Sequence, residues 1–241
     1  MFQIKTSTKP AFNSAKRNIE LLSSQLSHKN NVTWLLAGGS AINIYKEMSD
    51  LTKLDVDFSK LNISLGDERY SKDPNHKDAT WPIYEKLELF VELKKLGANI
   101  FEILSGKSLE AEADRFNNFL RDRLRNSDFI LCNLGVGTDS HTAGILPMND
   151  MELFEETYPE NRLAVGHKHG GVHPKRITVT PGFLKKANKI TVFMIGSDKK
   201  PVLKELHKYK ELEKTQNMIY KHPALVTSLM SAEVFTDQKL S

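Results

Sequence analysis

The sequence predicts an α/β fold, a three-layer αβα Rossmann-like sandwich with a mostly parallel central sheet. Two observations predict it. Apolar runs of strand length alternate with longer segments of helical period, and several of these runs end in Gly- or Asp-rich loops. Alternating strands and helices are typical of βαβ units stacked around one sheet. In such sheets ligands bind beyond the carboxyl ends of the strands, so chemistry is expected in those loops.

Each element is expected from its local pattern. The run at 129–134 is the most apolar and is expected to be the central strand. Further strands are expected at residues 32–37, 61–65, 99–104, 176–180, 190–195 and 233–236. Helical spacing of apolar residues predicts helices at residues 13–26, 41–51, 83–96, 109–124 and 199–209. A short helix is expected soon after residue 141, and residues 149–175 are expected to be largely irregular, with one apolar run at 163–165.

Length and composition indicate an ordinary globular protein. The 241 residues are 39% hydrophobic and 27% charged, and no repeat or flexible linker divides them, so one domain over residues 1–241 is expected. No run of 18 apolar residues and no apolar leader occurs, which predicts a cytoplasmic protein without a membrane partner. Cys132, the only cysteine, lies in an apolar run and is expected to be a core residue.

The charge pattern argues against a nucleic-acid partner. The net charge of +4 comes from 34 basic and 30 acidic residues interspersed along the chain. Proteins that bind nucleic acid concentrate basic charge on one element or interleave it with aromatic residues. The densest basic segment has the spacing of a solvated helix face and consists of Lys199, Lys200, Lys204, Lys208 and Lys210.

Two loops at predicted strand ends carry groups that suit an anion. Gly38, Gly39 and Ser40 lie between a strand and a helix, where backbone N–H groups can approach a phosphate and Ser40 can cap the helix. Asp67 and Arg69 follow the strand at 61–65. The guanidinium can bind phosphate through two N–H groups, and the acid can orient it or bind sugar hydroxyls. Taken alone, either loop also fits an ordinary surface turn.

The loop after the central strand, residues 134–147, carries the strongest candidate for catalysis. His141 lies two residues after Asp139. Histidine titrates near neutral pH and can take a proton from water, while a nearby carboxylate fixes its orientation. Gly135 and Gly137 allow a substrate to approach the backbone, and N–H groups at the start of the expected helix can stabilise an oxyanion. A general base is predicted, with a purely structural histidine as the alternative.

The same loop resembles the signature of the 6-phosphogluconolactonases, in which a Gly-x-Gly stretch leads to Asp-Gly-His-Thr-Ala-Ser and then Pro. Five further segments resemble that family in the same order along the chain: residues 35–45, 67–70, 174–180, 196–199 and 222–224. The resemblance covers nearly the whole chain. It implies a cytoplasmic enzyme of the oxidative pentose phosphate route, a monomer or homodimer, that hydrolyses the phosphorylated sugar lactone 6-phospho-D-glucono-1,5-lactone without a metal or cofactor.

Residue by residue, the resemblance implies that His141 is the general base and Asp139 its carboxylate partner. Water activated by His141 would attack C1 of the lactone, and the ring oxygen would leave as the C5 hydroxyl. The substrate- and phosphate-binding set that it implies is Gly38, Gly39, Ser40, Asp67, Arg69, Gly137, Arg176 and Lys199. Several cations and N–H donors at one end of the sugar would leave the lactone carbonyl beside the histidine.

Several positions depart from the family pattern. Ser140 stands where the family has glycine between Asp and His, which matters if that position has φ > 0. Gly144 stands where serine is usual. Ala41 and Ile42 replace Thr-Pro after the first loop, and Ala79 and Thr80 replace Ser-Asn. A weakened enzyme, or a sugar-phosphate binding protein without activity, is therefore an alternative.

Two further interpretations of the sequence are open. The related glucosamine-6-phosphate deaminases and isomerases share a similar Asp-Gly-His loop but continue with a glutamate before Pro, whereas residues 142–147 of this chain contain no glutamate. His167, His169 and His173 lie within seven residues and could ligate a transition metal, although a solvated loop is the favoured interpretation. Dinucleotide binding is disfavoured because neither Gly-rich loop completes the six-residue fingerprint.

Overall fold

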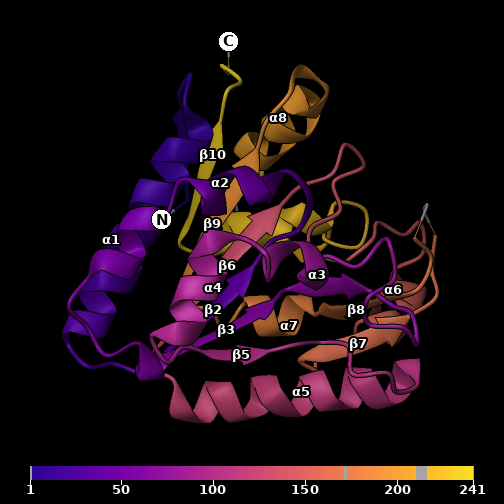
Figure 1. Cartoon of the computed structure of the whole chain (residues 1–241). Helices are drawn as coiled ribbons and strands as arrows, with labels where there is room; N and C mark the ends of the chain where they lie inside the picture. The colour runs from indigo at the N-terminus through magenta and orange to yellow at the C-terminus, as the bar shows by residue number, and fades with distance from the viewer. Residues whose placement is uncertain (1, 171–172, 210–215, 241) are drawn as a thin grey trace.

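The computed structural model describes residues 2–170, 173–209 and 216–240, and it has the predicted three-layer α/β architecture (Figure 1). Its centre is a seven-stranded sheet in the order β1-β10-β9-β6-β2-β3-β5, in which every neighbouring pair is parallel. The strands are β1 (Gln3–Thr6), β2 (Val32–Leu36), β3 (Leu61–Leu65), β5 (Asn99–Phe101), β6 (Phe129–Gly135), β9 (Lys189–Met194) and β10 (Ala232–Thr236). β2, β3 and β10 are buried along their whole length, as expected for parallel strands covered on both faces.

The chain reverses its direction across this sheet between β2 and β6. From β2 it proceeds to β3 and β5 on one side, and then to β6, β9 and β10 on the other. The loops that follow β2 and β6 therefore diverge at the carboxyl ends of two adjacent strands. Doubly wound sheets bind their ligands at such a point.

A second, antiparallel sheet of three strands was not expected. It has the order β4-β8-β7, with β4 (Asp67–Arg69), β8 (Arg176–Val179) and β7 (Ala164–His167). The strand predicted at 176–180 is confirmed, but it belongs to this sheet, and β4 and β7 lie where loops were predicted. The pairing of β4 with β8 joins residues about a hundred positions apart, such as Asp67 and Thr178, so no local pattern reveals it. β7 pairs with β8 much closer in sequence, for example Ala164 with Val179.

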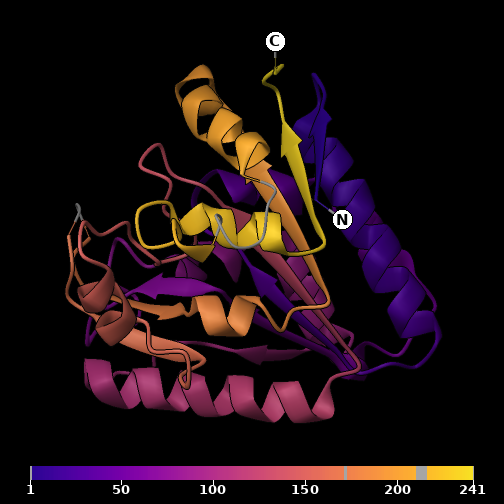
Figure 2. The same ribbon diagram turned by 180° about the vertical axis from the view of Figure 1, so that it is seen from behind.

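Helices cover both faces of the central sheet. α1 (Pro10–Ser27), α2 (Ile42–Lys46) and α4 (Glu88–Lys95) lie on the face seen in Figure 1, whereas α7 (Pro181–Leu184), α8 (Lys200–Lys208) and η5 (Pro223–Leu229) lie on the face seen in Figure 2. α5 (Leu109–Asn126) packs against β7 and β8. The remaining elements are α3 (Trp81–Tyr84), α6 (Met151–Thr157) and the 3-10 turns η1 (Gly39–Ala41), η2 (Ser49–Lys53), η3 (Phe58–Lys60) and η4 (Ser197–Lys199).

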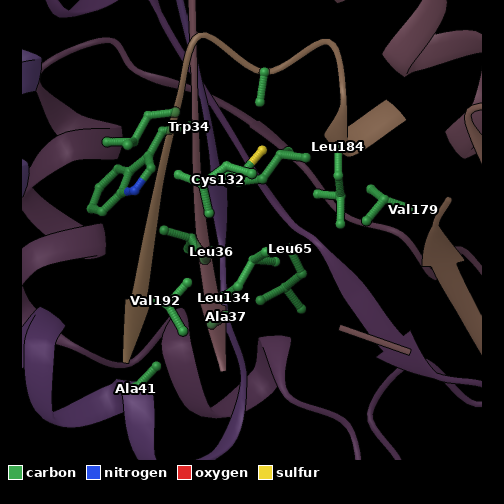
Figure 3. Close-up of a cluster of buried hydrophobic side chains, with 14 of the residues drawn as sticks. Trp34, Leu36, Ala37, Ala41, Leu65, Cys132, Leu134, Val179, Leu184 and Val192 are labelled. Carbon is green, nitrogen blue, oxygen red and sulfur yellow. The ribbon is translucent and has the colours of Figure 1, made fainter. Parts of the chain in front are cut away.

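Apolar side chains of the inner strands pack into a continuous core between these layers (Figure 3). Trp34 and Leu36 of β2, Leu134 of β6 and Val192 of β9 belong to this core, and all four are almost fully buried. Cys132 is completely buried, and burial raises the pKa of its thiol to about 12. The prediction that Cys132 is a core residue is confirmed.

Three predictions of secondary structure need correction. The helix expected at 41–51 is a turn, a short helix and a second turn (η1, α2 and η2), because Ser49 and Asp50 are residues that favour backbone-bonded turns. The helix expected at 83–96 is broken into α3 and α4 at Leu87, which is extended. The stretch at 149–175 is more regular than expected, because the Asp150 side chain accepts N–H bonds from Glu152 and Leu153 and caps α6.

In the part of the chain that the structure describes, no helix is both long and apolar enough to cross a bilayer. Of the five clustered lysines, Lys204 and Lys208 are exposed, whereas Lys210 lies outside the described residues. Lys199 and Lys200 are half-buried at the start of α8.

Candidate active site

A cleft opens at the carboxyl ends of β2 and β6, where the chain reverses direction across the sheet. The loops after these strands form two of its walls, and β4, Arg176 and Lys199 complete it. The residues predicted from the sequence that line it are Gly38, Gly39, Ser40, Asp67, Arg69, Gly137, His141, Arg176 and Lys199. Asp139 does not line the cleft but hydrogen-bonds His141. The fold therefore brings the whole predicted set together from five separate segments.

The first loop runs from Gly38 to Ser40 directly after β2. Gly39 has φ = +64°, a left-handed conformation that glycine adopts without steric cost. The expected capping of the helix by Ser40 is wrong: Ser40 lies inside the 3-10 turn η1 and is exposed, and neither η1 nor α2 has a side-chain cap. The loop presents mainly backbone to the cleft.

The second loop contributes an ion pair and a fixed guanidinium. Asp67 Oδ2 accepts from Arg176 Nη1 at 3.0 Å, and both side chains are largely buried. This pair forms because β4 and β8 are antiparallel neighbours. Arg69 Nη1 donates to the Thr80 hydroxyl at 3.0 Å and to the Asp78 carbonyl at 3.2 Å, which fixes one edge of its guanidinium.

Asp139 and His141 form a close pair in the third loop. His141 Nδ1 lies 2.6 Å from Asp139 Oδ1, and that carboxylate also accepts the His141 backbone N–H at 3.1 Å. The hydrogen bond with His141 holds the pKa of Asp139 at about 2, so the carboxylate is charged at neutral pH. Since Nδ1 faces this carboxylate, it carries the proton, and Nε2 keeps its lone pair for another partner.

Gly137 is required by the tight path of this loop. A Cβ at this position would lie 2.2 Å from His141 Nδ1 and 2.5 Å from Asp139 Oδ1, far inside van der Waals contact. Ser140, which replaces the family's glycine, has φ = +71°. Because φ at position 140 is positive, the replacement of glycine by serine affects the backbone energy. Serine adopts this left-handed conformation at the usual steric cost of a residue with a Cβ.

The helix expected after His141 is absent from the described residues of this loop. Residues 142–145 instead form a tight turn in which the Ile145 N–H donates to the Thr142 carbonyl at 2.9 Å. The positive φ of 48° at Ala143 prevents a helix from starting here. The proposal that helical N–H groups bind an oxyanion at this place is therefore wrong.

Three cationic side chains line the cleft, and among its described lining residues only one side chain, that of Asp67, is acidic. Arg69 and Arg176 lie on the second sheet, and Lys199 precedes α8. Lys199 Nζ donates to the Val136 carbonyl at 2.5 Å, which ties η4 to the loop after β6. The buried Arg176 Nε has no partner among the described residues. Because Asp67 balances one charge, the cleft carries a net positive charge that favours an anion.

Three residues of the site lie outside the predicted set, although Thr80 was noted as a departure from the family pattern. Asn133 and Thr80 line the cleft and are almost fully buried. Glu68 is 1% exposed, and its carboxylate accepts N–H bonds from Arg69, Thr80 and Trp81 at 2.8–2.9 Å. Burial raises the pKa of Glu68, and the three N–H bonds oppose that rise. An asparagine inside the most apolar strand was the one local signal that was available.

The three clustered histidines do not form a metal site. Within the residues that the structure describes, no group of three or more His, Cys, Asp or Glu side chains could hold a metal ion. His167 Nε2 lies 2.8 Å from the Gly144 carbonyl, and burial lowers the pKa of its imidazole to about 4. His173 Nδ1 lies 3.8 Å from Asp78 Oδ2. His167 thus supports the turn behind the cleft instead.

Comparison with known proteins agrees with this geometry. The sequence profile described as "Glucosamine-6-phosphate isomerases/6-phosphogluconolactonase" matches residues 6–229. The chain is 28% identical over 185 residues to a 6-phosphogluconolactonase of Haemophilus influenzae, covering 76% of this chain and 75% of that protein. A 6-phosphogluconolactonase of Aggregatibacter actinomycetemcomitans is 26% identical over 185 residues with the same coverage.

Solved structures share the fold over nearly the whole chain. A 6-phosphogluconolactonase from Plasmodium vivax superposes with a TM-score of 0.77 at 21% identity, covering 100% of this chain and 91% of that one. One from Shewanella baltica gives a TM-score of 0.75 at 18% identity, covering 98% and 96%. At this level of identity the likeness concerns the fold.

Proposed function

Because the chain belongs to the glucosamine-6-phosphate isomerase/6-phosphogluconolactonase family, we propose that it hydrolyses 6-phospho-D-glucono-1,5-lactone to 6-phosphogluconate. The observation that carries the proposal is the 2.6 Å contact between His141 Nδ1 and Asp139 Oδ1 beside a cleft that is lined by three cationic side chains. Its relatives named above are 6-phosphogluconolactonases. The reaction belongs to the oxidative pentose phosphate route.

The proposed substrate has a dianionic phosphate, which the cationic side of the cleft suits. Arg69 and Arg176 offer N–H groups in the planar arrangement that binds phosphate oxygens, and Lys199 adds a point charge. The buried Nε of Arg176 has no partner among the described residues, so the protein itself does not use every donor of this guanidinium. Gly38 and Gly39 allow the substrate to approach the backbone closely.

The chemistry is assigned to His141. Its Nε2 takes a proton from water while the water oxygen attacks C1 of the lactone, and Asp139 stabilises the imidazolium that forms. The bond between C1 and the ring oxygen then breaks, and His141 returns the proton to this departing oxygen, which becomes the C5 hydroxyl. Water and lactone give one acid, and the residues end the cycle unchanged.

The other activity in the family description is less well supported by the residues of this loop. Deamination of an amino sugar phosphate would use the glutamate that the related deaminases carry before Pro. Residues 142–147 hold Thr142, Ala143, Gly144, Ile145 and Leu146 before Pro147, with no acid among them. Of the residues in this turn, Ala143 lines the cleft.

A coupled assay tests the proposal. Glucose-6-phosphate dehydrogenase generates the lactone, and its disappearance is followed above the uncatalysed background. We expect acceleration by the wild-type protein and a loss of roughly 10²–10⁴-fold in His141→Ala, the usual contribution of a general base. His207→Ala, at an exposed position on α8, is the matched control and should keep full activity.

Two outcomes would contradict the proposal. An unchanged rate in His141→Ala would remove the proposed base. A wild-type protein that the lactone or 6-phosphogluconate protects against heat, without any acceleration of hydrolysis, would instead identify a sugar-phosphate binding protein that lacks activity.

A further inference from the structure

We propose that Tyr84 and Tyr45 are positioning residues for the anion-binding loop, because their hydroxyl groups fix the backbone of Ala37 and thereby hold the Gly38 N–H toward the cleft. The inference rests on the proposed function, since it assigns this N–H to the substrate phosphate. Neither tyrosine lines the cleft. Each would act through the backbone that it holds.

Both hydroxyls bond the residue at which the loop begins. Ala37 directly follows β2 and precedes Gly38. The Tyr84 hydroxyl donates to the Ala37 carbonyl at 2.7 Å, and the Tyr45 hydroxyl accepts the Ala37 N–H at 2.8 Å. The peptide groups on both sides of Ala37 are therefore fixed by side chains from α3 and α2.

The direction of the Gly38 N–H follows from peptide geometry. The Ala37 carbonyl and the Gly38 N–H belong to one planar group, and no described peptide bond is cis, so the two point in opposite directions. Tyr84 holds the carbonyl from the buried side, since it is 1% exposed. The N–H is thus directed away from the core, on the side where Gly38 lines the cleft. In the described part of the chain this N–H donates to no protein acceptor.

The tyrosine rings are themselves fixed by packing. They belong to an aromatic cluster of Trp34, Tyr45, Tyr84 and Phe90. The ring centroids of Tyr45 and Tyr84 are 5.3 Å apart, and those of Tyr84 and Phe90 are 5.9 Å apart with nearly parallel planes. Burial raises the pKa of both tyrosines, so both hydroxyls keep their protons at neutral pH.

The two glycines have no side chains that could fix this loop, so its backbone depends on the bonds to Ala37. A free Gly-Gly loop would have to lose much conformational entropy on binding phosphate. Here the core already fixes the peptide that leads into it. If the hydroxyl of Tyr84 is removed, the Ala37–Gly38 peptide can rotate, and the anion contact weakens while the reacting end of the substrate is unaffected.

The test compares Tyr84→Phe and Tyr45→Phe with wild type, and it uses Tyr70→Phe as the matched control, because the Tyr70 hydroxyl bonds the Lys107 carbonyl at 3.0 Å instead. The dissociation constant of 6-phosphogluconate is measured by titration calorimetry, and KM and kcat by the coupled assay. We expect Tyr84→Phe to weaken binding and raise KM about tenfold, the size of one lost bond to a charged group, with kcat changed less than about twofold. Tyr70→Phe should match wild type.

A merely structural role would give a different result. Variants that melt earlier but bind 6-phosphogluconate with wild-type affinity would overturn the inference while leaving the proposed function intact. A wild-type protein that neither binds 6-phosphogluconate nor hydrolyses the lactone would overturn both. If Tyr84→Phe does not fold, the wild-type amide resonance of Gly38 decides, since it must shift when inorganic phosphate is titrated in, and a resonance that stays fixed refutes the assignment.

Discussion

Replacement of Ser140 by glycine should stabilise the protein, although most substitutions in a buried loop beside a reactive centre destabilise. Ser140 is 2% exposed and has φ = +71°. Its hydroxyl is buried and has no hydrogen-bond partner among the described residues. Its backbone is well used, because the Ala224 N–H donates to its carbonyl at 2.9 Å and its own N–H donates to Gly137 at 3.1 Å. The Ser140 side chain therefore lowers the stability of the folded protein, whereas its backbone conformation is held by two hydrogen bonds.

The expected size follows from two separate costs. A left-handed conformation costs a non-glycine residue roughly 1–2 kcal/mol, and glycine removes this cost. Glycine also makes the unfolded chain more flexible, which lowers the gain in stability by about 0.4–1 kcal/mol. A buried hydroxyl without a partner costs a further 1–3 kcal/mol or so. Ser140→Gly should thus raise the free energy of unfolding by about 2 kcal/mol, which is about 4–8 °C in melting temperature for a chain of this size.

Ser140→Ala separates the two costs, because alanine removes the hydroxyl but keeps the Cβ in the left-handed conformation. It should gain only about 1 kcal/mol, the cost of the hydroxyl alone. Urea denaturation of the three proteins measures the free energies, and equal slopes check that the unfolded states are comparable. The coupled assay should give the same kcat for all three proteins, because the bonds between Asp139 and His141 do not involve the Ser140 side chain. A glycine variant no more stable than the alanine variant would refute the assigned cost of the positive φ.

Three further predictions concern the same loop and Glu233 of β10, the strand next to the edge strand β1. Gly137→Ala should abolish most activity, because its Cβ would lie 2.2 Å from His141 Nδ1, and the coupled assay on folded protein checks this. Gly144→Ala should lower the free energy of unfolding by about 1–3 kcal/mol through overpacking, since its Cβ would lie 2.8 Å from a side chain of β8, whereas Gly135→Ala, whose Cβ meets nothing within 4 Å, should change it by less than about 0.5 kcal/mol. Burial alone would raise the pKa of Glu233, but bonds from three cations outweigh it and hold the pKa at about 2 against an ordinary 4.5. Stability should therefore fall as pH drops from about 4.5 to 2, and Glu233→Gln should flatten that part of the unfolding profile; equal pH profiles for both proteins would contradict it.

The central sheet could be predicted because its strands are marked locally. A strand buried on both faces is a continuous apolar run, and β6 and β9 carry that mark. β1 and β4 do not, because β1 is a mostly exposed edge strand and β4 is the charged segment Asp67–Arg69. Such strands form through hydrogen bonds to a neighbouring strand, and that neighbour lies far away in the sequence.

The same distinction separates the predicted from the unpredicted parts of the site. Asp139 and His141 are two residues apart, so their contact could be expected from sequence. The pair of Asp67 and Arg176 spans 109 positions and depends on the antiparallel pairing of β4 with β8. The role of Glu68 was also hidden, because its three N–H partners include backbone groups that arrive only after a loop of ten residues.

The two departures from the family pattern in residues 134–147 have opposite physical consequences. At position 140 the family's glycine would suit the backbone better than serine does, because φ is positive. At position 144 the family's serine would not fit, because a Cβ there would press on Thr178, whose hydroxyl accepts the Gly144 N–H at 2.9 Å. Yet His141 and Asp139 remain 2.6 Å apart. The geometry of the pair is therefore set by Gly137 and by the bonds that hold the Ser140 backbone, so a loop that has diverged in sequence keeps the arrangement that the proposed reaction needs.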